Sequence, residues 1–236
     1  MLHFLHIGKT GGTAVKAALQ PHAEAGRFFI HLHEHETFLK DVPPGERAIF
    51  FLRDPITRFV SGFNSRLRQG KPRYSVPWTP AEKIIFWRFA TPNALALALS
   101  SANAEERAAA ENAMRGIRHV REHFAQWFGG EQDFLARRGD IVFIGFQESL
   151  TAAFEKLKMK LGLPASVALP TGDVAAHKTP EHFDQKLEPQ AVENLKRWYA
   201  DDIRFYQLSK RSPGKTTGNK SRNRQPAFRG TLKSKF

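Results

Sequence analysis

The pattern of apolar and polar positions along the chain predicts alternating strands and helices. Short apolar runs at residues 2–7, 28–33, 48–52 and 141–144 have the length of buried strands. A segment with helical spacing or a helix-start signal follows the first, third and fourth runs. Because parallel sheets need such crossovers, the pattern predicts an α/β fold: a P-loop-like parallel sheet flanked by helices, with an added helical region.

Capping residues predict where several helices begin and end. Asp54 precedes Pro55 and is expected to be an N-cap, and Thr79 with Glu82 has the spacing of a capping box. A helix over 150–161 is expected to end at Gly162. Residues 103–128 and 189–208 each read as one long helix. The first carries an apolar stripe expected to pack in the core: Met114, Ile117, Val120, Phe124 and Trp127.

Composition narrows the classes of protein that this chain can represent. Its 236 residues, 41% of them hydrophobic, are enough for one sizeable core. The absence of cysteine excludes disulfides, thiol catalysis and cysteine-ligated metals. No apolar run has the length of a membrane span, and the apolar start lacks a signal-peptide cleavage region, so a soluble, cytoplasmic protein is expected.

Basic residues are concentrated at the C-terminal end. The formal net charge is +13, and nine Lys and Arg with no acidic residue lie between Ser209 and Phe236, which leaves +4 on the rest. This segment has no helical or strand period, so we expect a folded domain over 1–208 and a disordered, low-complexity basic tail over 209–236. A solvated extension is the simplest interpretation of the tail. Binding to nucleic acid or an anionic glycan is the alternative.

A glycine-rich loop follows the first predicted strand and precedes a helix. Its sequence is Gly8-Lys9-Thr10-Gly11-Gly12-Thr13. Backbone N–H groups at such a helix start bind anions, and Lys9 adds positive charge. An NTPase P-loop needs glycine five residues before the Gly-Lys pair, where this chain has His3. The ordinary P-loop pattern therefore fails, and a plain strand-to-helix turn remains the structural alternative.

A second segment at the end of the third strand carries a matching set of polar residues. Arg53 stands at the strand end, and Ser61 lies two helical turns beyond Asp54. Both side chains can therefore face one crevice at the carboxyl edge of the sheet. Arginine forks onto phosphate and serine donates a hydroxyl. Taken alone, Arg-Asp-Pro is also a generic helix start.

Together the two segments resemble the phosphate-binding motifs of sulfotransferases that use 3′-phosphoadenylyl sulfate (PAPS). The pairing is closest to the carbohydrate branch that includes the uronyl and heparan sulfate 2-O-sulfotransferases. Three looser likenesses lie at residues 33–39, 142–148 and 177–179. The resemblance implies a bacterial-type soluble member that transfers a sulfuryl group to a hydroxyl of a carbohydrate, without a metal and without a specific nucleic acid partner.

The resemblance also implies roles for individual residues. Lys9 would contact the bridging oxygen of the leaving nucleotide, adenosine 3′,5′-bisphosphate, and Arg53 with Ser61 would hold its 3′-phosphate. The 5′-phosphate would be held by the rest of the loop, namely Gly8, Thr10, Gly11, Gly12, Thr13 and Ala14. His177 and Lys178 would approach cofactor or acceptor from a late loop.

The acceptor hydroxyl needs a base, and the resemblance places it at His35, with His33 as neighbour or substitute. Glu34 and Glu36 are alternatives, either as modifiers of a histidine pKa or as the base itself. Alternating His31, His33 and His35 also suggest a metal site, but alternate side chains on a strand are about 7 Å apart, so one ion would fit all three poorly.

Basic residues after the second motif, among them Arg58, Arg66 and Arg68, are expected to line a groove for an anionic acceptor. A solvated basic face is the alternative.

Two rival functions remain at this point. A nucleotide kinase or NTPase predicts magnesium-dependent ATP binding through Lys9, and a noncatalytic polyanion-binding module predicts that the basic tail carries ligand binding.

Overall fold

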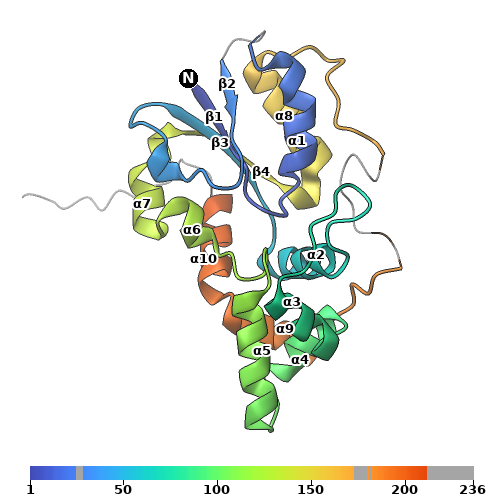
Figure 1. Ribbon diagram of the computed structural model, residues 1–236. Coiled ribbons are helices and arrows are strands. Elements are labelled where there is room, and N and C mark those ends of the chain that lie inside the picture. The colour runs from blue at the N-terminus through green and yellow to red at the C-terminus, as the bar shows by residue number, and fades with distance from the viewer. Residues whose placement is uncertain (25–28, 173–179, 181, 212–236) are drawn as a thin grey trace, which may run out of the picture.

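The computed structural model describes residues 1–24, 29–172, 180 and 182–211 and is built around a parallel sheet (Figure 1). Its strands are β1 (Leu2–Leu5), β2 (Ile30–Leu32), β3 (Arg47–Leu52) and β4 (Ile141–Phe146). They lie in the order β2-β1-β3-β4, and every neighbouring pair is parallel. The predicted α/β class is confirmed. The order reverses between β1 and β3, and such a reversal opens a crevice at the carboxyl ends of the strands.

The helix boundaries follow the capping residues. The described α-helices are α1 (Gly12–Leu19), α2 (Pro55–Leu67), α3 (Pro80–Arg88), α4 (Pro92–Ala98), α5 (Ala104–Gly116), α6 (Phe124–Phe128), α7 (Glu131–Ala136), α8 (Leu150–Leu161), α9 (Pro189–Trp198) and α10 (Ala200–Lys210). The Asp54 carboxylate accepts hydrogen bonds from two backbone N–H groups of α2, and Thr79 and Glu82 form the expected reciprocal box at α3. Gly162 ends α8 in the left-handed conformation.

The two long helices expected from the sequence are each broken, so those predictions were wrong. Helix α5 ends at Gly116, and the chain turns through His119, whose φ is 69°, before α6 begins. The apolar stripe is buried as predicted, but it serves two different cores, one with Met114 and the other with Trp127. A single straight helix would not reach both. The second break falls at Tyr199, whose hydroxyl donates to the Val120 carbonyl at 2.7 Å.

Each face of the sheet is covered by its own helices (Figure 1). Helices α1 and α8 cover one face and α6, α7 and α10 cover the other. The side chains of β3 alternate accordingly: Ile49 and Phe51 pack beneath α1 and α8, whereas Phe50 and Leu52 pack with the aromatic residues of the opposite layer. Burial on both faces explains why the strands read as continuous apolar runs.

A helical region extends below the carboxyl edge of the sheet (Figure 1). Helices α2, α3, α4, α5 and α9 share a third apolar core there. Helix α10 continues to Lys210, two residues beyond the predicted domain end, and the tail from residue 212 lies outside the described residues. Among the described helices, none combines the length and the apolar character needed to cross a bilayer.

Candidate active site

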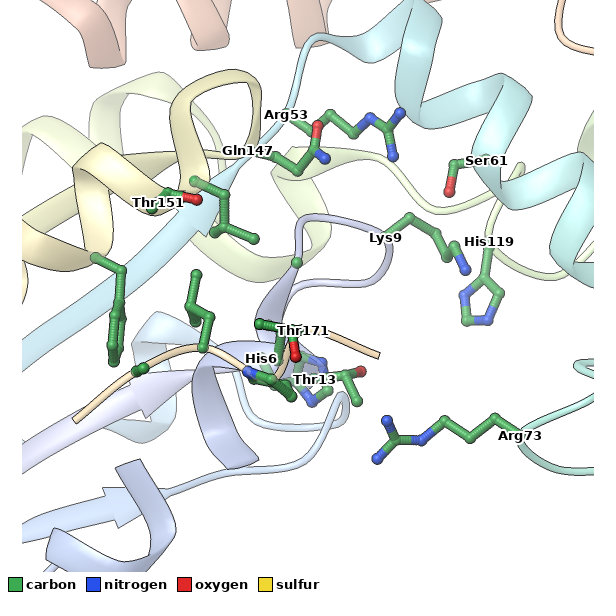
Figure 2. Close-up of a pocket in the computed structure, with 18 of the residues that line it drawn as sticks. His6, Lys9, Thr13, Arg53, Ser61, Arg73, His119, Gln147, Thr151 and Thr171 are labelled. Carbon is green, nitrogen blue, oxygen red and sulfur yellow. The ribbon is translucent and has the colours of Figure 1, made fainter. Parts of the chain in front are cut away.

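A pocket of about 760 Å³ opens at the point where β1 and β3 end (Figure 2). The first motif contributes Lys9, Gly11, Gly12, Thr13 and Ala14 to its lining, and the second contributes Arg53 and Ser61. Residues from seven further segments complete the lining: His6, His35, Arg73, Tyr74, His119, Gln147, Leu150, Thr151, Phe154, Glu155, Ala168, Leu169, Pro170, Thr171 and Gln185. The two motifs thus share one cavity, although about 40 residues separate them in the chain.

The glycine-rich loop is shaped by its own backbone and by a close contact with His6. Thr10 Oγ1 donates to the Ile7 carbonyl at 2.9 Å, which closes the turn. Gly11 is the N-cap of α1 with φ 86°, a conformation that glycine adopts without strain. At Gly12, a Cβ atom would lie 2.3 Å from the His6 ring. The loop therefore needs glycine at both positions. A plain strand-to-helix turn would not require this.

Lys9 is a cation surrounded by other cations. Burial, together with the charges of Arg68, Arg53 and Arg58, lowers the pKa of its amine to about 7, and Glu122 opposes the shift. Its side chain reaches across the pocket toward His119 (Figure 2). Such an excess of positive charge in a partly desolvated cavity favours binding of an anion, which would return the lysine to its charged form.

The second motif holds its arginine in place from the start of α2. Arg53 Nε donates to Thr57 Oγ1 at 3.0 Å, so the rest of the guanidinium faces the pocket, with Ser61 across from it (Figure 2). The preceding turn is fixed because the Asp54 N–H donates to Glu148 Oε1 at 2.6 Å. Burial lowers the pKa of Arg53 against the opposing charge of Glu148, yet arginine remains protonated. The result is a second cationic corner in the same cavity.

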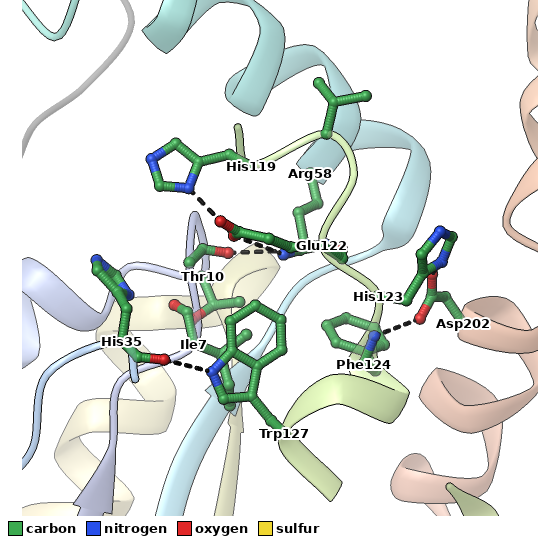
Figure 3. A network of polar contacts seen from close by, with 12 residues as sticks. Ile7, Thr10, His35, Arg58, His119, Glu122, His123, Phe124, Trp127 and Asp202 are labelled. Carbon is green, nitrogen blue, oxygen red and sulfur yellow. Dashed lines mark hydrogen bonds and ion pairs between the residues drawn. The ribbon is translucent and has the colours of Figure 1, made fainter. Parts of the chain in front are cut away.

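His35 lines the pocket with a defined tautomer. Its Nδ1–H donates to the His6 carbonyl at 2.8 Å, so Nε2 of the neutral ring carries the lone pair. The indole Nε1–H of Trp127 donates to the His35 carbonyl at 3.0 Å and fixes the backbone there (Figure 3). An imidazole that is held through Nδ1 presents the lone pair of Nε2, and that nitrogen can accept a proton.

The alternative bases at neighbouring positions lie elsewhere. His33 lies against His3 and His31, outside the pocket lining. Glu34 forms an ion pair with Lys16, and Glu36 is exposed. The geometry thus favours His35 over these neighbours as the group that reaches the cavity.

Two histidines that the sequence reasoning missed also line the pocket. Burial, helped by His35 and Lys16, lowers the pKa of His6 to about 2, so its ring stays neutral. His119 sits at the break between α5 and α6, and its Nδ1–H donates to Glu122 Oε2 at 3.2 Å (Figure 3). Burial lowers its pKa to about 4 although Glu122 opposes the change. Its position within an apparent helix concealed it.

Arg58 supports the loop and is not among the residues that line the cavity. It is 3% exposed, its Nε donates to the Gly8 carbonyl at 2.9 Å, and its Nη1 donates to the Glu122 carbonyl at 2.6 Å (Figure 3). Despite burial, the hydrogen bond from His119 and the charge of Arg58 lower the pKa of Glu122 to about 2. Arg58 and Glu122 thereby link the loop to the His119 turn.

The expected acceptor groove of arginines is likewise not assembled. Arg66 is buried and forms two hydrogen bonds with the Glu82 carboxylate, at 2.8 and 2.6 Å. Arg68 is buried and donates to the Lys71 carbonyl at 2.8 Å. Arg73, in the segment after α2, does line the pocket. Helix α2 is buried along most of its length, so Arg66 falls in the interior, and Arg68 is the buried C-cap residue that follows it. His177 and Lys178 lie outside the described residues.

These features define an α/β protein whose pocket brings Lys9 of the first motif together with Arg53 of the second. Comparison with protein-family models gives a match to the Sulfotransferase family over residues 1–209. The chain therefore belongs to the sulfotransferase family, whose members transfer sulfuryl groups. The searches of curated proteins and of solved structures each found no match.

Proposed function

We propose that this protein transfers the sulfuryl group of PAPS to a hydroxyl of a carbohydrate. The observation that supports the proposal best is that Lys9 and the pair Arg53 and Ser61, from separate motifs, line one cavity. The donor nucleotide carries phosphate at its 5′ and 3′ positions, and two cationic corners in one pocket meet that demand. ATP has no 3′-phosphate and would leave Arg53 without an anionic partner.

In the proposed reaction the loop and Lys9 bind the 5′ end of the donor. The acceptor oxygen bonds to sulfur as the bond from sulfur to the bridging phosphate oxygen breaks, and the bisphosphate leaves with the bonding electron pair. Negative charge grows on that oxygen, and the ammonium of Lys9 stabilises it. The nearby anion raises the pKa of Lys9 above the value of about 7 in the free protein, so the amine is charged when needed.

The proton of the acceptor hydroxyl goes to Nε2 of His35. This assignment rests on the hydrogen bond from His35 Nδ1 to the His6 carbonyl, which leaves Nε2 as the accepting nitrogen. His119 lines the same cavity and has its own Nδ1–H bound to Glu122, so it can orient the acceptor by its remaining nitrogen. The carbohydrate class of acceptor rests on the resemblance of the two motifs to the uronyl and heparan sulfate branch.

Calorimetry with nucleotides tests the donor assignment. Adenosine 3′,5′-bisphosphate should bind without magnesium and more tightly than ATP with or without it. Arg53→Ala should lower the affinity for the bisphosphate by about 10- to 100-fold, as expected for a lost charge-assisted contact. The same substitution should change the affinity for adenosine 5′-monophosphate little. Arg47→Ala, at the exposed start of β3, is the matched control. Equal or tighter binding of ATP would contradict the proposal and favour the kinase alternative.

A truncation separates the enzyme from the polyanion-binding alternative. Ser209 is buried and donates to the Phe205 carbonyl, so the cut belongs after Arg211 and not at the predicted boundary. The shortened chain should keep its affinity for the bisphosphate.

Transfer of labelled sulfate from PAPS to desulfated glycans, compared with simple phenols, tests the acceptor class. Labelling of phenols alone would contradict the carbohydrate assignment.

A further inference from the structure

A second group of histidines lies at the edge of the sheet, outside the pocket. His3 of β1 and His31 of β2 are direct register partners, and His33 follows two positions later on the same side. The ring centroids of His31 and His33 are 4.0 Å apart, and those of His3 and His33 are 5.1 Å apart. We define these three residues as the edge histidines.

A carboxylate orients the innermost member of the group. Nε2–H of His3 donates to Glu46 Oε2, so Nδ1 of the same ring carries a lone pair. That Nδ1 lies 2.8 Å from Nε2 of His33. Histidine ligands of metal ions commonly donate their other ring N–H to a carboxylate, which fixes the tautomer and the ring orientation. Glu46 gives His3 this arrangement.

We propose that the edge histidines bind one divalent transition-metal ion, with Zn²⁺ as the first candidate and Glu46 as the positioning residue of His3. One ligand atom from each ring lies within 4.8 Å of the others. Two nitrogens on a tetrahedral Zn²⁺ ion stand roughly 3.3 Å apart, given Zn–N bonds of about 2.0–2.1 Å. The stacked rings must splay to share an ion.

The surroundings allow that movement and select the class of ion. His31 is exposed and His33 is partly exposed, so both rings can turn without displacing core atoms, and solvent reaches the remaining coordination position. Three imidazoles suit Zn²⁺, Co²⁺, Ni²⁺ or Cu²⁺, whereas Mg²⁺ and Ca²⁺ prefer oxygen ligands.

An ion at this place would join two strands that are otherwise weakly connected. Strand β2 has only three residues and forms the edge of the sheet next to β1. The segment that follows β2 continues to His35, and Lys16 Nζ donates to the His33 carbonyl at 3.0 Å. The ion would therefore stabilise the path of the chain into the pocket without contacting the nucleotide. The proposal does not depend on the donor or acceptor assigned above.

Spectroscopic titration of the full chain, with any histidine tag removed, tests the site. Wild type should bind one equivalent of Co²⁺ with the intense visible absorption of a four-coordinate ion, and Zn²⁺ should displace it. His31→Ala, an exposed substitution, and Glu46→Gln should each weaken binding by about 10-fold or more. His22→Ala, a histidine in the turn after α1, is the control and should change nothing.

Two results would overturn the proposal. One is a wild-type protein that binds neither Co²⁺ nor Zn²⁺ in this titration. The other is equal affinity in wild type and His31→Ala. Because His31 is exposed, circular dichroism should report a native fold for this variant and exclude unfolding as the cause of a loss. Bisphosphate binding by calorimetry should be the same in wild type and His31→Ala, so failure of the metal site and failure of the proposed function remain distinguishable.

Discussion

Two groups of three histidines differ in their surroundings, although all of their members except His119 come from the same two stretches of chain. His6 and His35, joined by His119, line the pocket, whereas the edge histidines lie on the outer side of β1 and β2. A backbone carbonyl orients His35, and a carboxylate orients His3. The comparison teaches that an alternating His-x-His segment does not assign a role by spacing alone. The hydrogen-bond partner of each ring is what distinguishes the two groups.

The largest effect on the pocket group is expected from Lys9→Met. The variant loses the cation that faces the developing charge, so the rate of sulfuryl transfer should fall about a thousandfold. Single-turnover kinetics with PAPS measures this rate directly. Lys83→Ala, on the exposed side of α3, is the control and should keep the wild-type rate. A rate within threefold of wild type for Lys9→Met would remove Lys9 from the reaction.

His35→Gln and His33→Gln test the comparison itself. The first should lower turnover several hundredfold, because it removes the proposed base, and should keep the affinity for adenosine 3′,5′-bisphosphate. The second should change turnover by less than threefold, since His33 lies with the edge histidines. Steady-state rates and calorimetry on both variants provide the measurement. The reverse result would transfer the base role to His33.

Glu122→Gln and Glu46→Gln compare the two orienting carboxylates. Glu122 is 16% exposed and pairs with Arg58 and His119, so its loss should reduce the free energy of unfolding by about 3 kcal/mol. Glu46 is 37% exposed, and its loss should have an effect below about 1 kcal/mol. Urea denaturation of both variants at pH 7 measures the difference. Similar losses would show that the buried network is no stronger than the surface pair.

The contribution of Glu122 should also depend on pH. Its folded-state pKa of about 2 lies below the ordinary value of 4.5. The stabilisation is therefore fully present above pH 4.5 and is lost as pH falls toward 2. Denaturation curves of wild type and Glu122→Gln should converge over that range. Curves that stay parallel down to pH 2 would contradict the low pKa.

The smallest expected effect is proton uptake on nucleotide binding at pH 8. Lys9, with a pKa of about 7 in the free protein, is mostly neutral there, and a bound phosphate raises that pKa. Binding should take up close to one proton, and affinity should fall by up to tenfold per pH unit above 7. Calorimetry in buffers of different ionisation enthalpy measures the uptake. Lys9→Arg, always charged, should take up none, and equal uptake in both proteins would assign the proton to another group.

The sequence predicted the sheet and the two motifs because both depend on local signals. Apolar runs buried on two faces identify β1 and β3, and a glycine-rich turn needs no distant partner. The caps at Asp54 and Thr79 are likewise local, and the structure confirms them.

Features that depend on distant contacts were not predictable in the same way. The left-handed turn at His119 forms because the stripe residues serve two cores, and helical periodicity continues across it. Arg58 and Arg66 read as exposed cations, but Gly8 and Glu82 bind them in the interior. Pairing of His3 with His31 required the register of β1 and β2.

The contact between Gly12 and the His6 ring couples the two roles proposed for this site, donor binding and proton transfer. A methyl group at position 12 would push the ring away, and the carbonyl of the same histidine is the acceptor for His35 Nδ1. One added carbon atom would thus disturb both the proposed donor-binding loop and the hydrogen bond that orients His35, the proposed proton acceptor. Selection for activity should therefore tolerate only glycine at position 12. No substitution at this position should impair donor binding alone or proton transfer alone.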